Sequence, residues 1–170
     1  SQTIKEICDS DWKDLTIERL PKIPNFTLLV GWTGQVAITD SLIQATEKKR
    51  KVETDNAFYK GFLAKSHAIV QGLQNAWNNQ DIPALQEGIR ANRALLNEFA
   101  QVMQLEIETP ALQTLCNLAE QNGACAKTSG AGGGDCGICF TQNETQRQQI
   151  ETQWAKAQIQ VLPLSIAEAW

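Results

Sequence analysis

Residues 124–141 read ACAKTSGAGGGDCGICFT, and this stretch decides the fold. Two short runs of strand-forming residues, Ala124 to Ser129 and Cys136 to Thr141, flank the loop GAGGGD and predict a β-hairpin. A plain hairpin turn needs one or two glycines. This segment has five within eight positions, namely Gly130, Gly132, Gly133, Gly134 and Gly137. Because extra glycines cost backbone entropy, they indicate a loop that reaches positive φ repeatedly and leaves room for a ligand against its backbone.

Further strands are predicted before and after the hairpin. The run Phe26 to Trp32 (FTLLVGW) is apolar, rich in strand formers and bounded by Pro24-Asn25 and Thr33-Gly34. A weaker strand, Leu15 to Leu20, precedes this run, and a last strand, Ile159 to Leu164, follows the hairpin.

Helices are predicted between these strands. Apolar residues spaced by threes and fours predict a long helix over residues 58–77. Three more helices are predicted to start at residues that cap helices well: Asp81, Thr109 before Pro110, and Asn143 with Gln146 three residues on.

Without the weak first strand, the order is strand, helices, strand, strand, helix, strand. This order is typical of the split βαβ, or ferredoxin-like, arrangement, an α+β fold with an antiparallel sheet and helices packed on one face. A chain of 170 residues is long enough for one such domain. We therefore expect a single domain over residues 1–170, with residues 1–24 as a lead-in segment.

The composition argues against several classes of function. A net charge of -4 and a pI near 5.0 give no electrostatic reason to expect nucleic acid or an anionic membrane as partner. No stretch approaches the roughly 18 apolar residues of a membrane span, and residues 1–12 lack the layout of a signal peptide. A cytoplasmic enzyme is the expectation.

Cysteine and histidine give little reason to expect a metal site. Cys136 and Cys139 are the only close pair among the five cysteines, and in a strand they would point to opposite faces. We favour free buried thiols in a reducing compartment. The single histidine, His67, is expected on a helix surface, and one histidine argues against a Ser/His/Asp triad or a histidine metal site.

The glycine loop has the chemistry of a phosphate site. Consecutive backbone N–H groups in such a loop converge into an anion nest. Lys127 adds a cation, and Thr128 and Ser129 add hydroxyl donors. The pattern is neither GxxxxGK[ST], because the lysine precedes the glycines, nor a GxGxxG between a strand and a helix. The alternative is a structural glycine-rich turn that binds no ligand.

The segment Lys127 to Cys136 (KTSGAGGGDC) resembles the third conserved motif of the GHMP kinases. Its Gly-Asp-Cys ending is similar to the phosphomevalonate kinases in particular, since mevalonate kinases tend to have another glycine where Asp135 stands. Gly31 to Gly34 (GWTG) and Thr109 to Leu112 (TPAL) resemble the same members of the superfamily. The likeness runs in order over nearly the whole chain.

The resemblance implies a C-terminal domain of ferredoxin-like fold. The N-terminal ATP-binding domain of that superfamily, with its Gly-Leu-Gly-Ser-Ser-Ala loop, has no counterpart in this sequence. The implied reaction uses ATP and Mg²⁺ and transfers the γ-phosphoryl group to 5-phosphomevalonate, a chemistry that depends on charge neutralisation and positioning. We expect the chain by itself to be inactive, because the nucleotide-binding half is missing.

The chemistry of the loop and the family resemblance together predict residues that bind phosphate or substrate. They predict no catalytic residue. Phosphate or substrate is expected at Lys127, Thr128, Ser129, Gly130, Ala131, Gly132, Gly133, Gly134, Asp135, Trp32, Thr33 and Arg93. The N–H groups of Ser129 to Gly134 are expected to act as preorganised donors. Asp135 is expected to brace the loop, with magnesium binding as the alternative. Trp32 and Thr33 would line the acceptor pocket, although Trp32 is equally well explained as a core-edge aromatic. Arg93 would reach an acceptor phosphate with its bidentate fork.

Two other functions remain open. One is another GHMP kinase such as mevalonate kinase, against which Asp135 and the GWTG segment argue. The other is a non-catalytic anion-binding module of the same fold.

Overall fold

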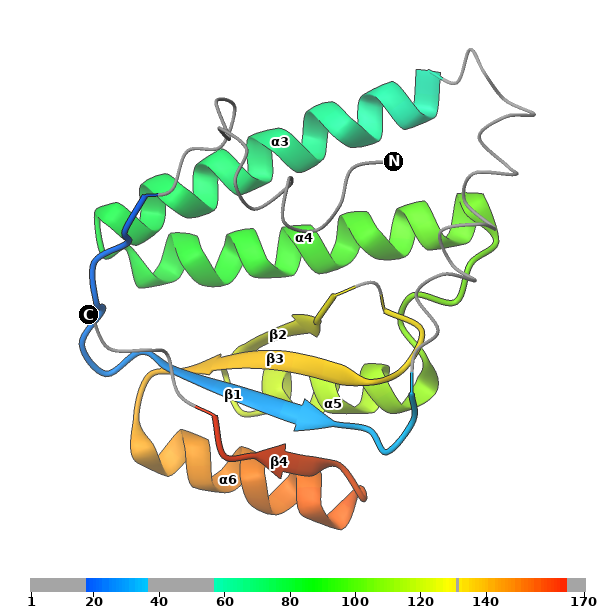
Figure 1. Cartoon of the computed structure of the whole chain (residues 1–170). Helices are drawn as coiled ribbons and strands as arrows, with labels where there is room; N and C mark the ends of the chain where they lie inside the picture. The colour runs from blue at the N-terminus through cyan, green and yellow to red at the C-terminus, as the bar shows by residue number, and fades with distance from the viewer. Residues whose placement is uncertain (1–17, 37–56, 131, 165–170) are drawn as a thin grey trace, which may run out of the picture.

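The structure, a computed structural model, describes residues 18–36, 57–130 and 132–164 (Figure 1). Its helices and strands are β1 (Thr27–Trp32), α3 (Ala57–Asn78), α4 (Ile82–Met103), α5 (Pro110–Gln121), β2 (Cys125–Thr128), β3 (Cys136–Thr141), α6 (Glu144–Lys156) and β4 (Gln160–Leu162).

The strands form an antiparallel sheet in the order β2-β3-β1-β4. β1 and β3 pair along their whole length, from Thr27 opposite Thr141 to Trp32 opposite Cys136. With α5 before β2 and α6 between β3 and β4, this is the split βαβ order. The predicted ferredoxin-like α+β fold is confirmed, and these strands begin and end within two residues of their predicted limits.

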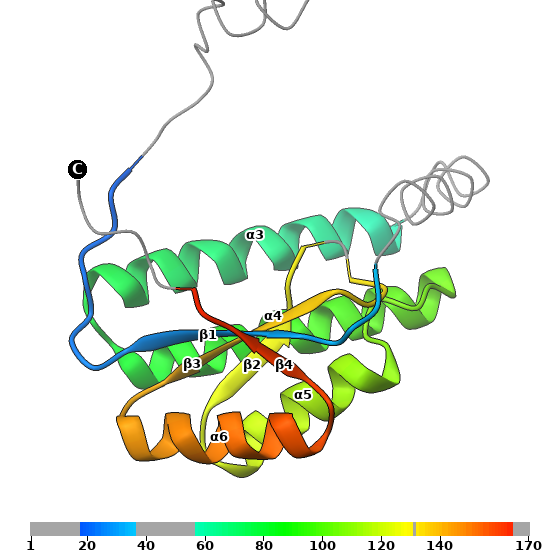
Figure 2. The same cartoon turned by 60° about the horizontal axis from the view of Figure 1, so that its bottom comes forward.

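Helices cover both faces of the sheet, as Figures 1 and 2 show with α3 above it and α6 below. α5 and α6 pack on one face around Leu115, Cys139 and Trp154. α3 and α4 form a hairpin on the other face, where Phe140 stacks on Phe26 with ring centroids 4.8 Å apart. The expectation of helices on one face therefore holds for α5 and α6 but not for the α3–α4 hairpin. Successive residues of β3 point to opposite faces, and apolar side chains on both faces need cover.

Each predicted cap begins a helix. In each case a side-chain oxygen of the cap accepts a hydrogen bond from the backbone amide three residues later in the chain. Asp81 accepts from Ala84 (3.1 Å), Thr109 from Leu112 (3.4 Å) and Asn143 from Gln146 (2.9 Å). These bonds satisfy amides that have no partner within the helix. Local side-chain chemistry thus decides where α4, α5 and α6 start.

Two glycines allow α5 and α6 to approach the sheet closely. Gly31 and Gly137 are paired across β1 and β3. A Cβ on Gly137 would lie 2.7 Å from the side chain of Leu115, and one on Gly31 would lie 2.8 Å from both Leu115 and Trp154. Trp154 in turn donates its indole N–H to the carbonyl of Leu115 (3.0 Å). The space that the two glycines leave is therefore filled by the central side chains of the core.

The N-terminal segment differs from its prediction. Of the predicted strand Leu15 to Leu20, residues 18–20 form no strand, and residues 15–17 lie outside the described residues. Within the lead-in segment, Ile23 is buried in a cluster with Phe26 and Leu85, so the segment packs against the α3–α4 hairpin. In the described ranges, no helix is both long enough and apolar enough to cross a membrane.

Candidate functional site

The glycine loop, residues 129–135, joins β2 to β3 and is held at one end by the turn after β1. Thr33 donates its amide (2.9 Å) and its hydroxyl (3.0 Å) to the carbonyl oxygen of Asp135. The amide of Asp135 donates to the carbonyl of Gln35 (2.8 Å). Two segments that resemble motifs of one family, GWTG and the glycine loop, are therefore adjacent in the structure.

The middle of the loop is held by residues 104–109, which link α4 to α5 and which we call the connector. The amide of Gly133 donates to the carbonyl of Ile107 (2.8 Å). Gly132 has a φ of 78°, and a Cβ there would overlap the same carbonyl. The loop thus needs glycine at position 132 both for its backbone conformation and for its close approach to the connector.

The amides of the loop fall into two groups. Those of Ser129, Gly133 and Asp135 donate to protein carbonyls, the first of these to Cys136 (2.9 Å). Within the described residues, three amides have no protein acceptor: those of Gly130, Gly132 and Gly134. The amides of Ser129 and Gly133 therefore fix the shape of the loop, and the prediction that amides of Ser129 to Gly134 hold phosphate stays a prediction that depends on the others.

Lys127 lies on β2 just before the loop and is half-buried. Its Nζ donates to the carbonyl of Thr128 (2.7 Å), which uses one of three N–H groups. Burial lowers the pKa of Lys127. In the described ranges of the chain, no carboxylate forms an ion pair with this ammonium group. A cation in this situation would gain from binding an anion, because the anion would replace the water lost on burial.

Asp135 braces the loop through its main chain. It occupies the left-handed region with a φ of 59° and bonds to Thr33 and Gln35 through its peptide groups. Its carboxylate is exposed and accepts a long contact from the thiol of Cys136 (3.6 Å). The structure is thus compatible with the expected bracing role, but the peptide groups rather than the carboxylate form the braces.

The other predicted loop-side residues have different surroundings. The Thr128 side chain is buried, whereas Ser129 is half-buried at the start of the loop. Trp32 is half-buried at the end of β1, opposite Cys136 of β3, and a part in an acceptor pocket stays a prediction. Thr33 uses its hydroxyl hydrogen on Asp135 and so acts on the shape of the loop.

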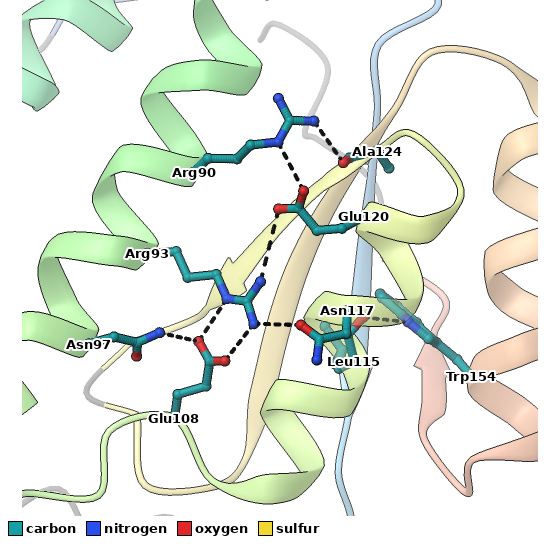
Figure 3. A network of polar contacts seen from close by, with 9 residues as sticks. All are labelled: Arg90, Arg93, Asn97, Glu108, Leu115, Asn117, Glu120, Ala124 and Trp154. Carbon is teal, nitrogen blue, oxygen red and sulfur yellow. Dashed lines mark hydrogen bonds and ion pairs between the residues drawn. The ribbon is translucent and has the colours of Figure 1, made fainter.

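Arg93 is directed at Glu108 and Asn117, as Figure 3 shows. Its Nε and Nη2 donate to the two carboxylate oxygens of Glu108 in the connector (2.8 and 2.6 Å), and Nη2 also donates to Asn117 of α5 (3.0 Å). A carboxylate of the protein thus occupies the fork in this structure, which does not support the use of Arg93 on an acceptor phosphate, and that role stays a prediction.

The Arg93–Glu108 pair is well shielded from water, with side-chain exposures of 16% and 5%. The hydrogen bond with Glu108 raises the pKa of Arg93. Burial by itself raises the pKa of Glu108, but hydrogen bonds from Arg93 and Asn97 more than offset it and hold that pKa below its usual range. Both side chains are therefore charged at neutral pH.

The cysteines of the described residues are free thiols. Cys139 is buried against α5 and α6 while Cys136 points to the other face, as their spacing predicts. Burial raises the pKa of Cys116 to about 12, well above the range of reactive thiols. In the described part of the chain, no group of three or more His, Cys, Asp or Glu residues could hold a metal ion, and His67 is exposed on α3.

Sequence reasoning missed the residues that hold the loop from outside. Gln35 and Ile107 act through main-chain carbonyls, which every residue has, so no side-chain pattern marks them. Glu108 carries a weak signal. An arginine on the inner face of a helix needs a carboxylate partner, and Glu108 directly precedes the predicted cap Thr109.

Comparisons with known proteins identify the family of this chain. The family described as GHMP kinases C terminal matches residues 69–160. A phosphomevalonate kinase from Streptomyces sp. (strain CL190) is 35% identical over 158 residues, which cover 92% of this chain and 42% of that protein.

Two solved structures extend the comparison. The Lin0012 protein from Listeria innocua has a TM-score of 0.86 and 30% identity, over 95% of this chain and 45% of that one. The Streptococcus pneumoniae phosphomevalonate kinase in complex with phosphomevalonate and AMPPNP has a TM-score of 0.68 and 28% identity, over 81% of this chain and 38% of that one. The chain therefore spans less than half the length of these relatives.

Proposed function

Because this chain belongs to the GHMP kinase family as its C-terminal domain, we propose that it is the C-terminal half of an ATP-dependent phosphomevalonate kinase. In the proposed reaction, a phosphate oxygen of 5-phosphomevalonate attacks the γ-phosphorus of ATP. The bond from that phosphorus to the β,γ-bridging oxygen breaks, and ADP leaves with the electron pair. The product, 5-diphosphomevalonate, belongs to the mevalonate pathway of isoprenoid biosynthesis.

The glycine loop is the observation that carries the proposal. Within the described residues, the amides of Gly130, Gly132 and Gly134 have no protein acceptor, and Lys127 supplies a half-buried cation on the strand that leads into the loop. Donors that are held in place before the ligand arrives stabilise developing phosphoryl charge without a reorganisation cost. The bonds at Gly133 and Asp135 supply that preorganisation.

ATP and Mg²⁺ are the proposed cofactors. AMPPNP, found with the Streptococcus enzyme, is an analogue of ATP, which supports nucleotide binding by the whole protein. Mg²⁺ usually binds through substrate phosphates with one or two carboxylates and several waters. Asp135 is the single carboxylate of the loop. The residues of the loop therefore fit a Mg²⁺ ion that is held chiefly by the phosphates of the nucleotide. The nucleotide itself would be bound by an N-terminal domain, and an ATP-consuming enzyme of this kind would work in the cytoplasm.

We propose that this chain is part of a longer protein. Measuring the kinase turnover of that longer protein tests the proposed function. ADP formation with Mg²⁺ and 5-phosphomevalonate is expected, whereas mevalonate should be a poor acceptor. The 170-residue chain alone should show no turnover. A preference for mevalonate would instead indicate another GHMP kinase. Anion binding at the loop without turnover on either acceptor would favour the non-catalytic module.

A further inference from the structure

We propose that the Arg93–Glu108 ion pair positions the glycine loop, acting through the connector and without touching the substrate. The inference rests on the proposed function in one respect, namely that the loop holds phosphate. Arg93 and Glu108 are positioning residues in this account, because neither contributes a donor to the ligand.

The connection between the pair and the loop is short. The carbonyl that accepts the Gly133 amide belongs to the peptide group between Ile107 and Glu108. Any rotation of that peptide group would move the carbonyl away from Gly133. The loop also approaches this peptide group closely at Gly132, where a Cβ would overlap the same carbonyl.

Side chains on both sides of this peptide group are held by α4. Both carboxylate oxygens of Glu108 accept hydrogen bonds, from Arg93 (2.8 and 2.6 Å) and from Asn97 (3.1 Å) (Figure 3). The Ile107 side chain is buried with Phe99 and Met103. With its two flanking side chains fixed, the Ile107 carbonyl has one preferred direction, and that direction meets the Gly133 amide.

The chemistry of the pair suits positioning better than stability. Replacing a buried ion pair by apolar residues of similar volume often leaves stability unchanged or raises it. A bidentate arginine–carboxylate pair, in contrast, has defined directions for two hydrogen bonds and fixes the orientation of its partner. If stability alone mattered between α4 and the connector, apolar side chains would serve at least as well.

The test compares two double variants of the 170-residue chain. Arg93→Met with Glu108→Leu removes the pair without leaving a lone buried charge. Lys65→Met with Glu98→Leu is the control, because that pair (3.4 Å) joins α3 to α4 and, among the described residues, has no bond to Arg93 or to the connector. The readouts are thermal midpoint, hydrogen exchange of the Gly133 amide, and NMR shifts of Gly130, Gly132 and Gly134 on titration with inorganic phosphate.

The first double variant should keep its thermal midpoint but exchange the Gly133 amide about tenfold faster and bind phosphate about tenfold more weakly, a usual size for coupling through packed neighbours. The control pair should leave Gly133 exchange and phosphate binding near wild type. Arg93→Lys, which keeps the charge but loses the fork, should give an intermediate exchange rate.

Unchanged Gly133 exchange in the first variant, or equal loosening in both variants, would overturn the proposal. The exchange readout needs no ligand. If wild type failed to bind phosphate while Gly133 exchange responded as expected, the positioning would stand and the proposed phosphate function of the loop would fail.

Discussion

Thr33 donates twice to the carbonyl oxygen of Asp135, once from its amide (2.9 Å) and once from its hydroxyl (3.0 Å). The two residues are 102 positions apart in the chain. Asp135 returns a bond from its own amide to Gln35 (2.8 Å), so the turn after β1 and the end of the glycine loop form one hydrogen-bonded unit. The turn after β1 therefore holds the Asp135 end of the loop in place, and the connector holds its middle.

Thr33→Val should destabilise the chain by about 1 kcal/mol, because it removes one hydroxyl hydrogen bond and keeps shape and amide unchanged. Thr33→Ser, which restores the hydroxyl, should recover most of the loss. Urea unfolding of the three proteins measures the effect. A serine variant as unstable as the valine variant would show that the methyl group, not the hydroxyl bond, matters at this position.

Gly132→Ala and Gly130→Ala separate backbone strain from close contact. Both glycines have positive φ, 78° and 66°, so alanine at either should cost about 1–2 kcal/mol of strain. Only at Gly132 does the new Cβ meet the Ile107 carbonyl, whereas at Gly130 it meets open space. Gly132→Ala should therefore lower the free energy of unfolding by roughly 1–3 kcal/mol more than Gly130→Ala, which is the usual cost of overpacking. It should also speed the hydrogen exchange of the Gly133 amide. Equal losses for the two variants would mean that the contact with the connector is unimportant.

Gly137→Ala should destabilise the core by roughly 1–3 kcal/mol, because its Cβ would lie 2.7 Å from Leu115 and force the packed core to shift. The matched control is Gly72→Ala on α3, where the new methyl group has open space. That change should instead stabilise the chain by up to about 1 kcal/mol, since alanine is the better helix former. Thermal midpoints that moved in the same direction would contradict the packing described around Leu115.

The affinity of the loop for sulfate should fall with rising pH. The fall should begin at a lower pH than it would if the binding lysine were fully exposed. Burial lowers the pKa of Lys127, so its ammonium group loses its proton below the ordinary lysine value of about 10.4. A bound dianion favours the charged form and raises that pKa. Affinity is therefore full at pH values below the lowered pKa and falls as the pH rises through it. Sulfate stays doubly charged over this range, so changes in affinity report on the protein.

Calorimetric titration at several pH values measures this dependence. Lys127→Met should bind sulfate weakly, with little change between neutral and alkaline pH. Lys65→Met is the control, because Lys65 is exposed on α3 and paired with Glu98. If Lys65→Met weakened binding as much as Lys127→Met, the anion would be attracted by overall charge and not by the loop.

The sequence by itself determined the elements and their order. Caps at Asp81, Thr109 and Asn143, alternation in β3 and the glycine density before it are local features, because each depends on residues within a few positions of one another. The place of the candidate phosphate loop, with Lys127 before it, was predictable for the same reason.

The tertiary structure decided which groups of the loop are available to a ligand. Gly133 and Gly134 look alike in the sequence, but only the amide of Gly133 is used by Ile107, a residue of the distant connector. Arg93 has the chemistry of a phosphate ligand, but the buried carboxylate of Glu108 occupies its fork. A hydrogen bond consumes a donor wherever its acceptor comes from, so the donors left over could be identified only after segments far apart in the chain had been placed together.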